Sequence, residues 1–185
     1  MPRLNTINPA EATGKAKKLL DGVQAKLGMT PNLMKTVANS PAALEAYLGF
    51  GAALSTGALD AKFREQIALA VAQANSCEYC LSAHSAIGNM VGLNAEEIRA
   101  SRESHSADAK RDAGLRFAQS VVLQRGEVSD AAIEQVYQAG YTDGEIAEIV
   151  ANVAINIFTN YFNNVAHTEV DFPRVPVTLL SNQHA

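Results

Sequence analysis

The stretch that decides the fold runs from Asp60 to His84 and reads DAKFREQIALAVAQANSCEYCLSAH. Its first part, residues 60–75, starts with an aspartate that can cap a helix and carries apolar side chains in nearly every direction around the helix axis. A helix that is apolar all round is buried in a core or at a subunit interface. The second part, residues 76–84, carries both cysteines of the chain. The stretch therefore predicts a buried central helix followed directly by a helix with a cysteine pair.

Helix signals dominate the rest of the chain as well. Alanine is abundant, and no convincing alternation of apolar and polar residues predicts a strand. Prolines and capping side chains mark the expected helix starts, and glycines mark several of the ends. The sequence therefore predicts an all-α protein. Its expected helices cover residues 9–26, a short stretch between Pro31 and Pro41, and residues 41–54, 60–75, 77–91, 95–101, 107–124, 130–139 and 143–167.

The last of these helices is also apolar on most sides. Its polar exceptions are chiefly asparagines. A single chain of 185 residues has difficulty covering two such helices on all sides, so we expect a homo-oligomer. The asparagines are Asn152, Asn156, Asn160, Asn163 and Asn164.

Composition and length place the chain among folded globular proteins. It has 185 residues, of which 48% are hydrophobic and 18% charged. This length fits one domain over residues 1–185, with a core that needs no metal or disulfide to support it. The proline-containing tail, residues 171–185, is expected to be irregular.

Charge and hydropathy argue against nucleic-acid-binding and membrane-spanning proteins. The net charge is −4, and no cluster of Lys and Arg provides an electrostatic surface for nucleic acid. No apolar run approaches the roughly 18 residues of a membrane span. The first residues lack the apolar segment of a secretory signal. We therefore expect a cytoplasmic protein with neither nucleic acid nor a membrane as its partner.

The spacing of Cys77, Cys80 and His84 points to thiol chemistry. On a helix, these three positions fall along one face, and His84 is close enough to Cys80 to take or hold its proton. Cys77 falls at the helix start, where the helix dipole and free amide N–H groups stabilise a thiolate. A dithiol at a helix N-terminus in a cytoplasmic protein is typical of reversible thiol–disulfide exchange.

Two other interpretations of the pair stay open. Buried cysteines can act as small apolar core residues. Cys77, Cys80, His84 and one carboxylate could instead bind zinc, although donors so close on one helix converge poorly on a tetrahedral centre. The sequence has no second Cys-x-x-Cys, which also disfavours zinc.

Glu65 is unusual because its helical neighbours include Ala68, Leu69 and Ala72. A carboxylate on an apolar face is costly unless it is paired or protonated, so Glu65 on that face needs a partner. Alternatively, Glu65 lies on a solvated edge beside Lys62. Periodicity alone favours neither position.

Glu65, the run Cys77-Glu78-Tyr79-Cys80, and His84 together resemble the motif of the AhpD-like alkylhydroperoxidases of the carboxymuconolactone decarboxylase superfamily. The resemblance is centred on residues 52–93, and the whole chain is similar to the peroxidase-related branch. It implies an all-α, AhpD-like multi-helix fold that assembles as a homo-oligomer, a trimer or a hexamer. It also implies an antioxidant oxidoreductase that reduces alkyl hydroperoxides.

The resemblance implies a role for each residue of the motif. Cys80 attacks the peroxide, and Cys77 resolves the resulting sulfenic acid as a disulfide. Glu65 and His84 form the proton relay that activates Cys80. Tyr79 stands where better-studied members carry a histidine, and it is a further candidate for the relay. A phenol is a poor proton shuttle at neutral pH, although its hydroxyl still donates a hydrogen bond.

Peroxide reduction by a dithiol needs no bound redox cofactor, and the chain has no glycine-rich nucleotide motif. We therefore expect an external dithiol reductant, either a protein or a lipoyl-type donor. Two alternative functions are a carboxymuconolactone decarboxylase-like enzyme and a redox- or metal-sensing helical oligomer. The cysteine pair argues against the decarboxylase, because that branch does not depend on the pair.

Overall fold

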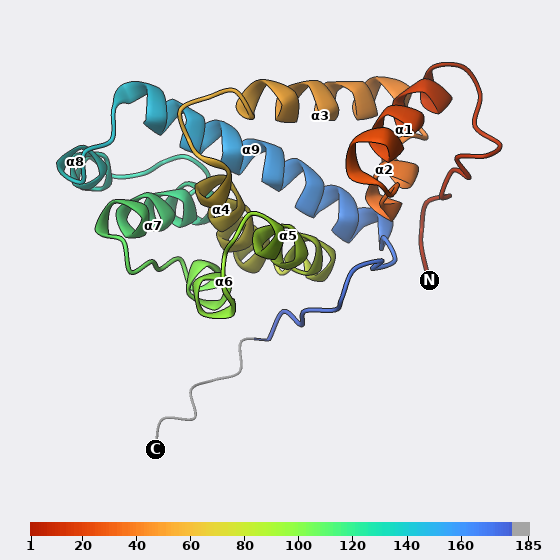
Figure 1. The fold of residues 1–185 in the computed structure, drawn as a ribbon. Coiled ribbons are helices and arrows are strands. Elements are labelled where there is room, and N and C mark those ends of the chain that lie inside the picture. The colour runs from red at the N-terminus through yellow and green to blue at the C-terminus, as the bar shows by residue number, and fades with distance from the viewer. Residues whose placement is uncertain (179–185) are drawn as a thin grey trace.

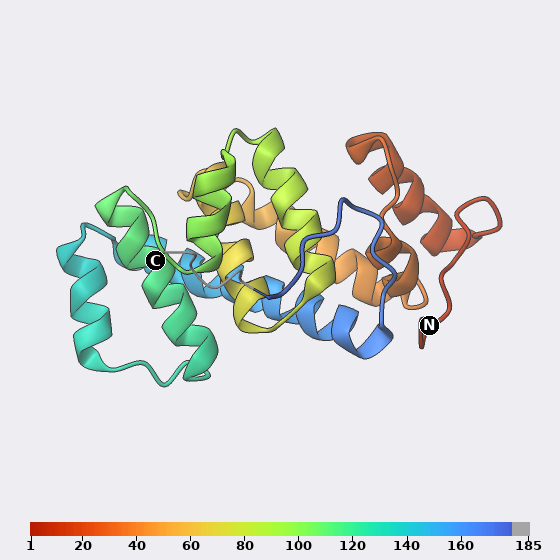
Figure 2. The same ribbon diagram turned by 90° about the horizontal axis from the view of Figure 1, so that it is seen from below.

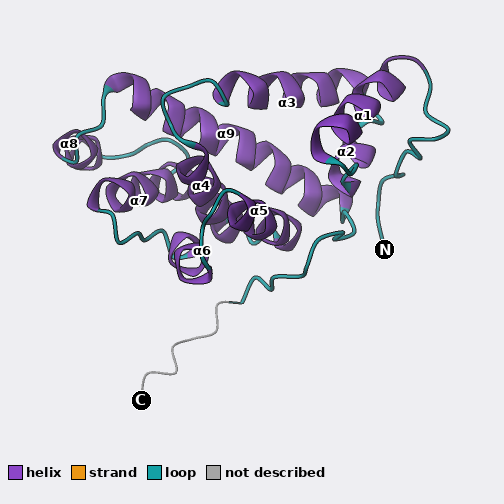
Figure 3. Cartoon of the chain, viewed as in Figure 1, coloured by secondary structure: helices purple, strands orange, loops and turns teal. Residues whose placement is uncertain are grey.

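In the computed structural model, residues 1–178 are described, and they form helices joined by loops with no strand among them (Figure 3). Residues 179–185, the end of the tail predicted to be irregular, lie outside the described residues. The all-α prediction is confirmed for the described part. The helices are α1 (Gly14–Leu27), α2 (Asn32–Val37), α3 (Pro41–Leu54), α4 (Ala61–Ala74), α5 (Glu78–Met90), α6 (Ala95–Arg102), α7 (Ala109–Leu123), α8 (Asp130–Gln138) and α9 (Asp143–Ala166).

The central helix is α4, which packs against α5, α6, α7 and α9 (Figure 1). Asp60 caps it, because its carboxylate accepts a hydrogen bond from the Phe63 amide at 2.9 Å. Ile67, Leu69 and Val71 of α4 are completely buried although they point in different directions around the helix. The prediction of a helix buried on all sides is confirmed.

Two apolar clusters flank α4. One joins α1, α2, α3 and α5 and includes both cysteines, and the other joins α7, α8 and α9 to the opposite side of α4. Completely buried side chains lie at the centre of each cluster: Leu20, Leu44 and Leu81 in the first, and Ile67, Leu115 and Ile149 in the second. The cysteine pair therefore belongs to the core rather than to a surface loop.

The helix starts follow the predicted caps, with one exception. Asn94 and Thr142 each form a capping box with the glutamate three residues later, as their sequences indicate. The predicted start of the first helix at Pro9 is wrong. Residues 9–12 form a turn in which Asn8 accepts hydrogen bonds from the amides that follow it, and the helix begins only at Gly14.

The structure shows to which side the asparagines of the long helix α9 point, a feature for which the sequence made no prediction. The asparagines at positions 152, 156, 160 and 163 face inward with Ile149 and Val153, whereas four large apolar side chains lie outside. An inward polar stripe is favourable only where hydrogen bonds satisfy it. The exposed apolar side chains are Val150, Phe158, Tyr161 and Val165.

The segment after α9, residues 168–178, turns back across α5, and we call it the C-terminal strap (Figure 2). The Val175 amide donates to Ser82 Oγ at 3.0 Å, and Arg174 pairs with Glu78 at 3.1 Å. Arg102 donates to the Pro176 carbonyl oxygen at 2.7 Å. The strap is irregular, as predicted, yet hydrogen bonds tie it to the helix that carries the cysteines.

Within the described residues, we find no helix with the length and hydropathy that crossing a membrane requires.

We predict that Gly114→Ala destabilises the fold by about 1–3 kcal/mol, because overpacking a core has costs of this size. An added Cβ at Gly114 would collide with the Tyr141 hydroxyl and the Phe63 ring. Gly22→Ala is the matched control, since no atom lies within 4 Å of its new Cβ and alanine favours a helix interior. Urea unfolding of both variants measures the difference. Equal stability of the two variants would contradict the tight packing of Gly114 against Phe63 and Tyr141.

Candidate active site

The cysteine pair sits at the start of α5, directly after the turn that ends α4. Cys77 is the N-cap, and its sulfur accepts a hydrogen bond from the Cys80 amide at 3.4 Å. The Cys77 amide donates back to the Ala72 carbonyl oxygen at 2.9 Å, which fixes the turn. Both cysteines are free thiols, and their exposed fractions are 0% for Cys77 and 2% for Cys80. Any reagent that reaches them must enter through a cavity or displace part of the structure.

The two thiols are electrostatically unequal. A hydrogen bond from the Cys77 thiol lowers the pKa of Cys80, and the positive charge of His84 lowers it further, whereas burial opposes both effects. The same hydrogen bond and burial raise the pKa of Cys77. Cys80 is therefore the cysteine that ionises first, and Cys77 keeps its proton.

Glu65 of α4 and His84 of α5 form an ion pair next to Cys80. Glu65 Oε2 lies 2.8 Å from His84 Nδ1, and the two side chains are 18% and 19% exposed. Burial lowers the pKa of His84, but the charge and hydrogen bond of Glu65 outweigh it, so the net shift is upward. Sequence periodicity left the position of Glu65 open, and the structure gives it a partner.

Tyr79 lies between the cysteines in sequence, but its hydroxyl takes part in a different contact. The hydroxyl accepts a hydrogen bond from the Leu33 amide at 3.1 Å and donates to Asp171 Oδ1 at 2.9 Å. Asp171 Oδ2 also accepts from the Asn32 amide at 2.7 Å, so the phenol links the C-terminal strap to the start of α2. Phe172 packs edge-on against the Tyr79 ring. Burial raises the pKa of Tyr79, so its proton is held in the Asp171 hydrogen bond.

An apolar cavity of about 200 Å³ opens beside the Cys80 sulfur. Cys80 and His84 contribute its reactive groups, and most of the remaining wall is hydrocarbon or aromatic. Such a cavity favours a compact apolar ligand over a charged one. The apolar wall includes Met29, Leu33, Met34, Ala83, Ile87 and Phe172.

A second cavity, of about 150 Å³ and with a mixed polar and apolar lining, also borders the ion pair. Arg64, Glu65, Asn152 and Asn156 line it, and His84 lines both cavities. Tyr47 of α3 also borders both, and burial together with the nearby negative charges raises its pKa to about 12. Sequence analysis missed Tyr47, because no spacing or motif connects it to the cysteine pair.

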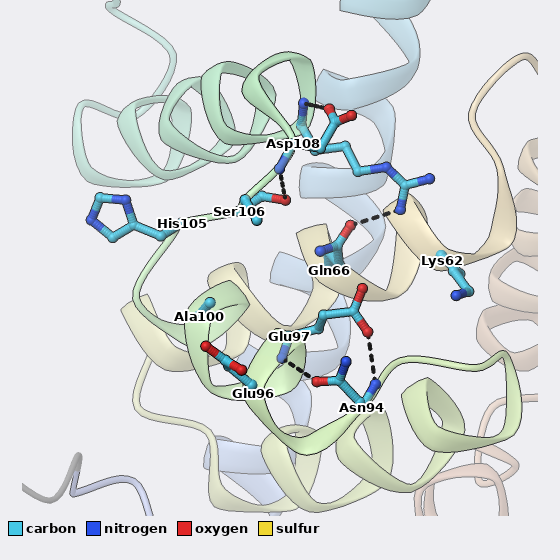
Figure 4. A pocket seen from close by; sticks show the side chains of 11 residues that line it. Lys62, Gln66, Asn94, Glu96, Glu97, Ala100, His105, Ser106 and Asp108 are labelled. Atoms are coloured by element: carbon cyan, nitrogen blue, oxygen red, sulfur yellow. Dashed lines mark hydrogen bonds between the residues drawn. The ribbon is translucent and has the colours of Figure 1, made fainter.

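A larger cavity, of about 560 Å³, lies between α4, α6 and the loop that leads into α7 (Figure 4). Several of its polar groups serve the fold: Asn94 and Glu97 cap α6 reciprocally, and Asp108 caps α7. Arg111 donates to Gln66 at 3.1 Å. Neither cysteine lines this cavity. Among residues 1–178, no three His, Cys, Asp or Glu side chains converge as metal ligands would.

Comparison with known proteins adds two sequence relationships. Residues 41–120 match the carboxymuconolactone decarboxylase family. An uncharacterized protein of Haemophilus influenzae is 56% identical over 46 residues, which is 24% of this chain and 41% of that protein. The chain therefore covers less than half the length of this relative.

Comparison of structures extends over nearly the whole chain. A peroxidase-related protein with an alkylhydroperoxidase AhpD core, from Ralstonia eutropha JMP134, has a TM-score of 0.81 at 28% identity, over 95% of this chain and 97% of that one. A peroxidase-related protein from Silicibacter sp. TM1040 has a TM-score of 0.79 at 24% identity, over 91% and 94% of the two chains. A variant of the debrominase Bmp8 bound to 2,3,4-tribromopyrrole has a TM-score of 0.79 at 20% identity, over 92% of each chain. The chain has the AhpD-like helical fold.

We predict that Glu65→Gln lowers the pKa of His84, because burial then acts without the opposing carboxylate. In the wild type, the stability that this pair contributes is full below the unfolded-state pKa of histidine. It is lost as pH rises through the raised folded-state pKa. NMR titration of the histidine rings measures the shift. Glu78→Gln is the control, since Glu78 pairs with Arg174 and not with His84. An unchanged His84 titration in Glu65→Gln would contradict the ion pair.

Proposed function

We propose that this protein is a thiol peroxidase that reduces organic hydroperoxides. The match of residues 41–120 to the carboxymuconolactone decarboxylase family and the AhpD-like fold of the chain support the proposal. One observation carries the proposal. Cys80, whose pKa is lowered, lines an apolar cavity together with His84, and His84 is paired with Glu65. A nucleophile, a proton donor and a binding surface for an alkyl group are therefore next to one another.

In the first step, the Cys80 thiolate attacks the terminal oxygen of the hydroperoxide. A sulfur–oxygen bond forms and the oxygen–oxygen bond breaks, so that sulfur loses two electrons to the peroxide and becomes a sulfenic acid. His84, paired with Glu65, takes the proton of Cys80 when the thiolate forms, and the leaving alkoxide then takes this proton from His84. Burial opposes the protonated form of His84, but the charge and hydrogen bond of Glu65 outweigh it and raise the pKa of His84.

In the second step, the Cys77 thiol attacks the Cys80 sulfenic acid. A disulfide forms, the sulfur–oxygen bond breaks, and the hydroxyl leaves as water with the Cys77 proton. The neighbouring positions of the two sulfurs at the start of α5 support this step. An external dithiol then reduces the disulfide and is itself oxidised, which restores both thiols. This cycle requires both cysteines, whereas a decarboxylase with the same fold would not depend on the pair.

Assembly with further copies of the chain forms part of the proposal. The outer faces of α3 and α9 expose Phe50, Phe158, Tyr161 and Val165. Exposed apolar side chains that cluster on neighbouring helices are typical of protein–protein interfaces. We infer a homo-oligomer, a trimer or a hexamer, whose subunits cover this face. The expected cytoplasmic location is consistent with two free thiols.

We predict that Cys80→Ser abolishes hydroperoxide consumption, because a serine hydroxyl is not ionised where the thiol is. Cys77→Ser should consume one peroxide per chain and then stop with a sulfenic acid at Cys80, since no second thiol remains to resolve it. Peroxide consumption and trapping of the sulfenic acid with dimedone measure the two outcomes. Circular dichroism checks that both variants fold. Undiminished turnover by Cys80→Ser would refute the assignment of the nucleophile.

A further inference from the structure

The inward polar stripe of α9 contains two kinds of side chain. Asn152 and Asn156 donate to carbonyl oxygens one turn earlier in their own helix, both at 2.8 Å. Thr159 donates to the Asn156 carbonyl oxygen at 3.0 Å. These three side chains are satisfied locally, so their burial needs no other explanation.

Asn160 and Asn163 make no such local bonds; Asn163 contacts the Cys80 sulfur, and Asn160 lies close enough to it to lower the pKa of the thiol. Asn163 is 3% exposed, and its Nδ2 donates to the Cys80 sulfur at 3.3 Å. Asn160 is completely buried, and its Oδ1 accepts a hydrogen bond from Asn75 Nδ2 at 3.0 Å. That bond fixes the amide plane and leaves Asn160 Nδ2 without a hydrogen-bond partner among residues 1–178. A buried donor without a partner is unfavourable, and such a donor in a native fold calls for an explanation.

We propose that the amides of Asn160 and Asn163 are a donor pair that stabilises the anionic form of Cys80, with Asn75 as the residue that positions Asn160. The proposal rests on Cys80 being the attacking thiol in the proposed function. Asn163 contacts the reacting sulfur and is a catalytic residue in that sense. Asn160 supplies a second N–H to the same buried anion.

The physical reason is that a buried thiolate needs fixed donors in place of water. Prearranged N–H dipoles stabilise charge in a site of low dielectric without any reorganisation during the reaction. Both amides act to lower the pKa of Cys80. Amides also carry no titratable proton. Their effect therefore persists where His84 loses its charge.

The two amides of α9 are neutral, whereas the titratable groups that shift the pKa of Cys80 lie on other elements. Substitutions in α9 therefore measure the contribution of the amides alone. The titratable groups around the sulfur are Cys77 and Tyr79 next to it in the motif, His84 one turn later on α5, Tyr47 on α3 and, behind His84, Glu65 on α4.

The test measures the pKa of Cys80 in a Cys77→Ser background, which leaves one thiol in the chain and keeps a hydroxyl donor beside it. The ultraviolet absorbance of the thiolate, followed against pH, requires no reagent to enter the buried site. We expect Asn163→Leu to raise this pKa by about one unit, so that the thiolate fraction at the parent's pKa falls roughly fivefold. Asn160→Leu should raise it in the same direction. Asn163→Asp, which matches asparagine in size, should raise it at least as far, because a carboxylate replaces the donor.

Asn164→Ala is the matched control. Asn164 lies next to Asn163 on α9, is exposed, and donates to the Asn75 carbonyl oxygen at 3.1 Å rather than to Cys80. An unchanged Cys80 pKa in folded Asn163→Asp and Asn160→Leu would overturn the proposal, as would an equal shift in Asn164→Ala. The measurement uses no peroxide. A raised pKa in a protein that consumes no hydroperoxide would therefore retain the donor pair and reject the peroxidase.

Discussion

The burial of α4 on every side is the constraint on which the rest of the structure depends. Because residues 66–72 of this helix are buried on every side, α5, α6, α7 and α9 all pack against it. This packing places Glu65 of α4 opposite His84 of α5 and brings Asn163 of α9 to the Cys80 sulfur. The same helix that forms the core therefore sets the positions of the reactive groups. Its turn into α5 leaves the cysteine pair at a helix start, where backbone N–H groups are free to stabilise negative charge.

The site places a buried thiol with a lowered pKa, Cys80, at the wall of an apolar cavity. An isolated thiolate in a core would be strongly unfavourable, so Cys80 ionises only with the donors and the positive charge around it. Cys80 and His84 share the wall of the cavity with hydrocarbon and aromatic side chains, so an apolar ligand there meets both the sulfur and the imidazole. The second cavity borders Glu65 and His84 as well, and in the proposed cycle it would admit water and protons to this pair. Alkyl groups and protons would then reach the site through different cavities.

The sequence predicted features that depend on residues within a few positions of one another, but not contacts between residues far apart in the chain. Caps at Asp60, Asn94 and Thr142 follow from side chains within one turn, and the stripe of Cys77, Cys80 and His84 follows from helical spacing. The contacts of Tyr79 with Asp171 and of Asn163 with Cys80 join residues far apart in the chain, and neither has a motif. The predicted start of the first helix failed because the turn closed by Asn8 delays it. The sequence made no prediction of the side to which the asparagines of α9 point, and Asn152 and Asn156 face inward with hydrogen bonds to carbonyl oxygens of their own helix.

The measurement that tests the central claim most directly counts thiols and peroxide together. The protein is reduced, freed of reductant and mixed with one equivalent of cumene hydroperoxide. The account predicts that both thiols of each chain disappear as one peroxide is consumed, and that the product is the Cys77–Cys80 disulfide. Full retention of both thiols in the folded protein, with the peroxide left intact, would contradict it.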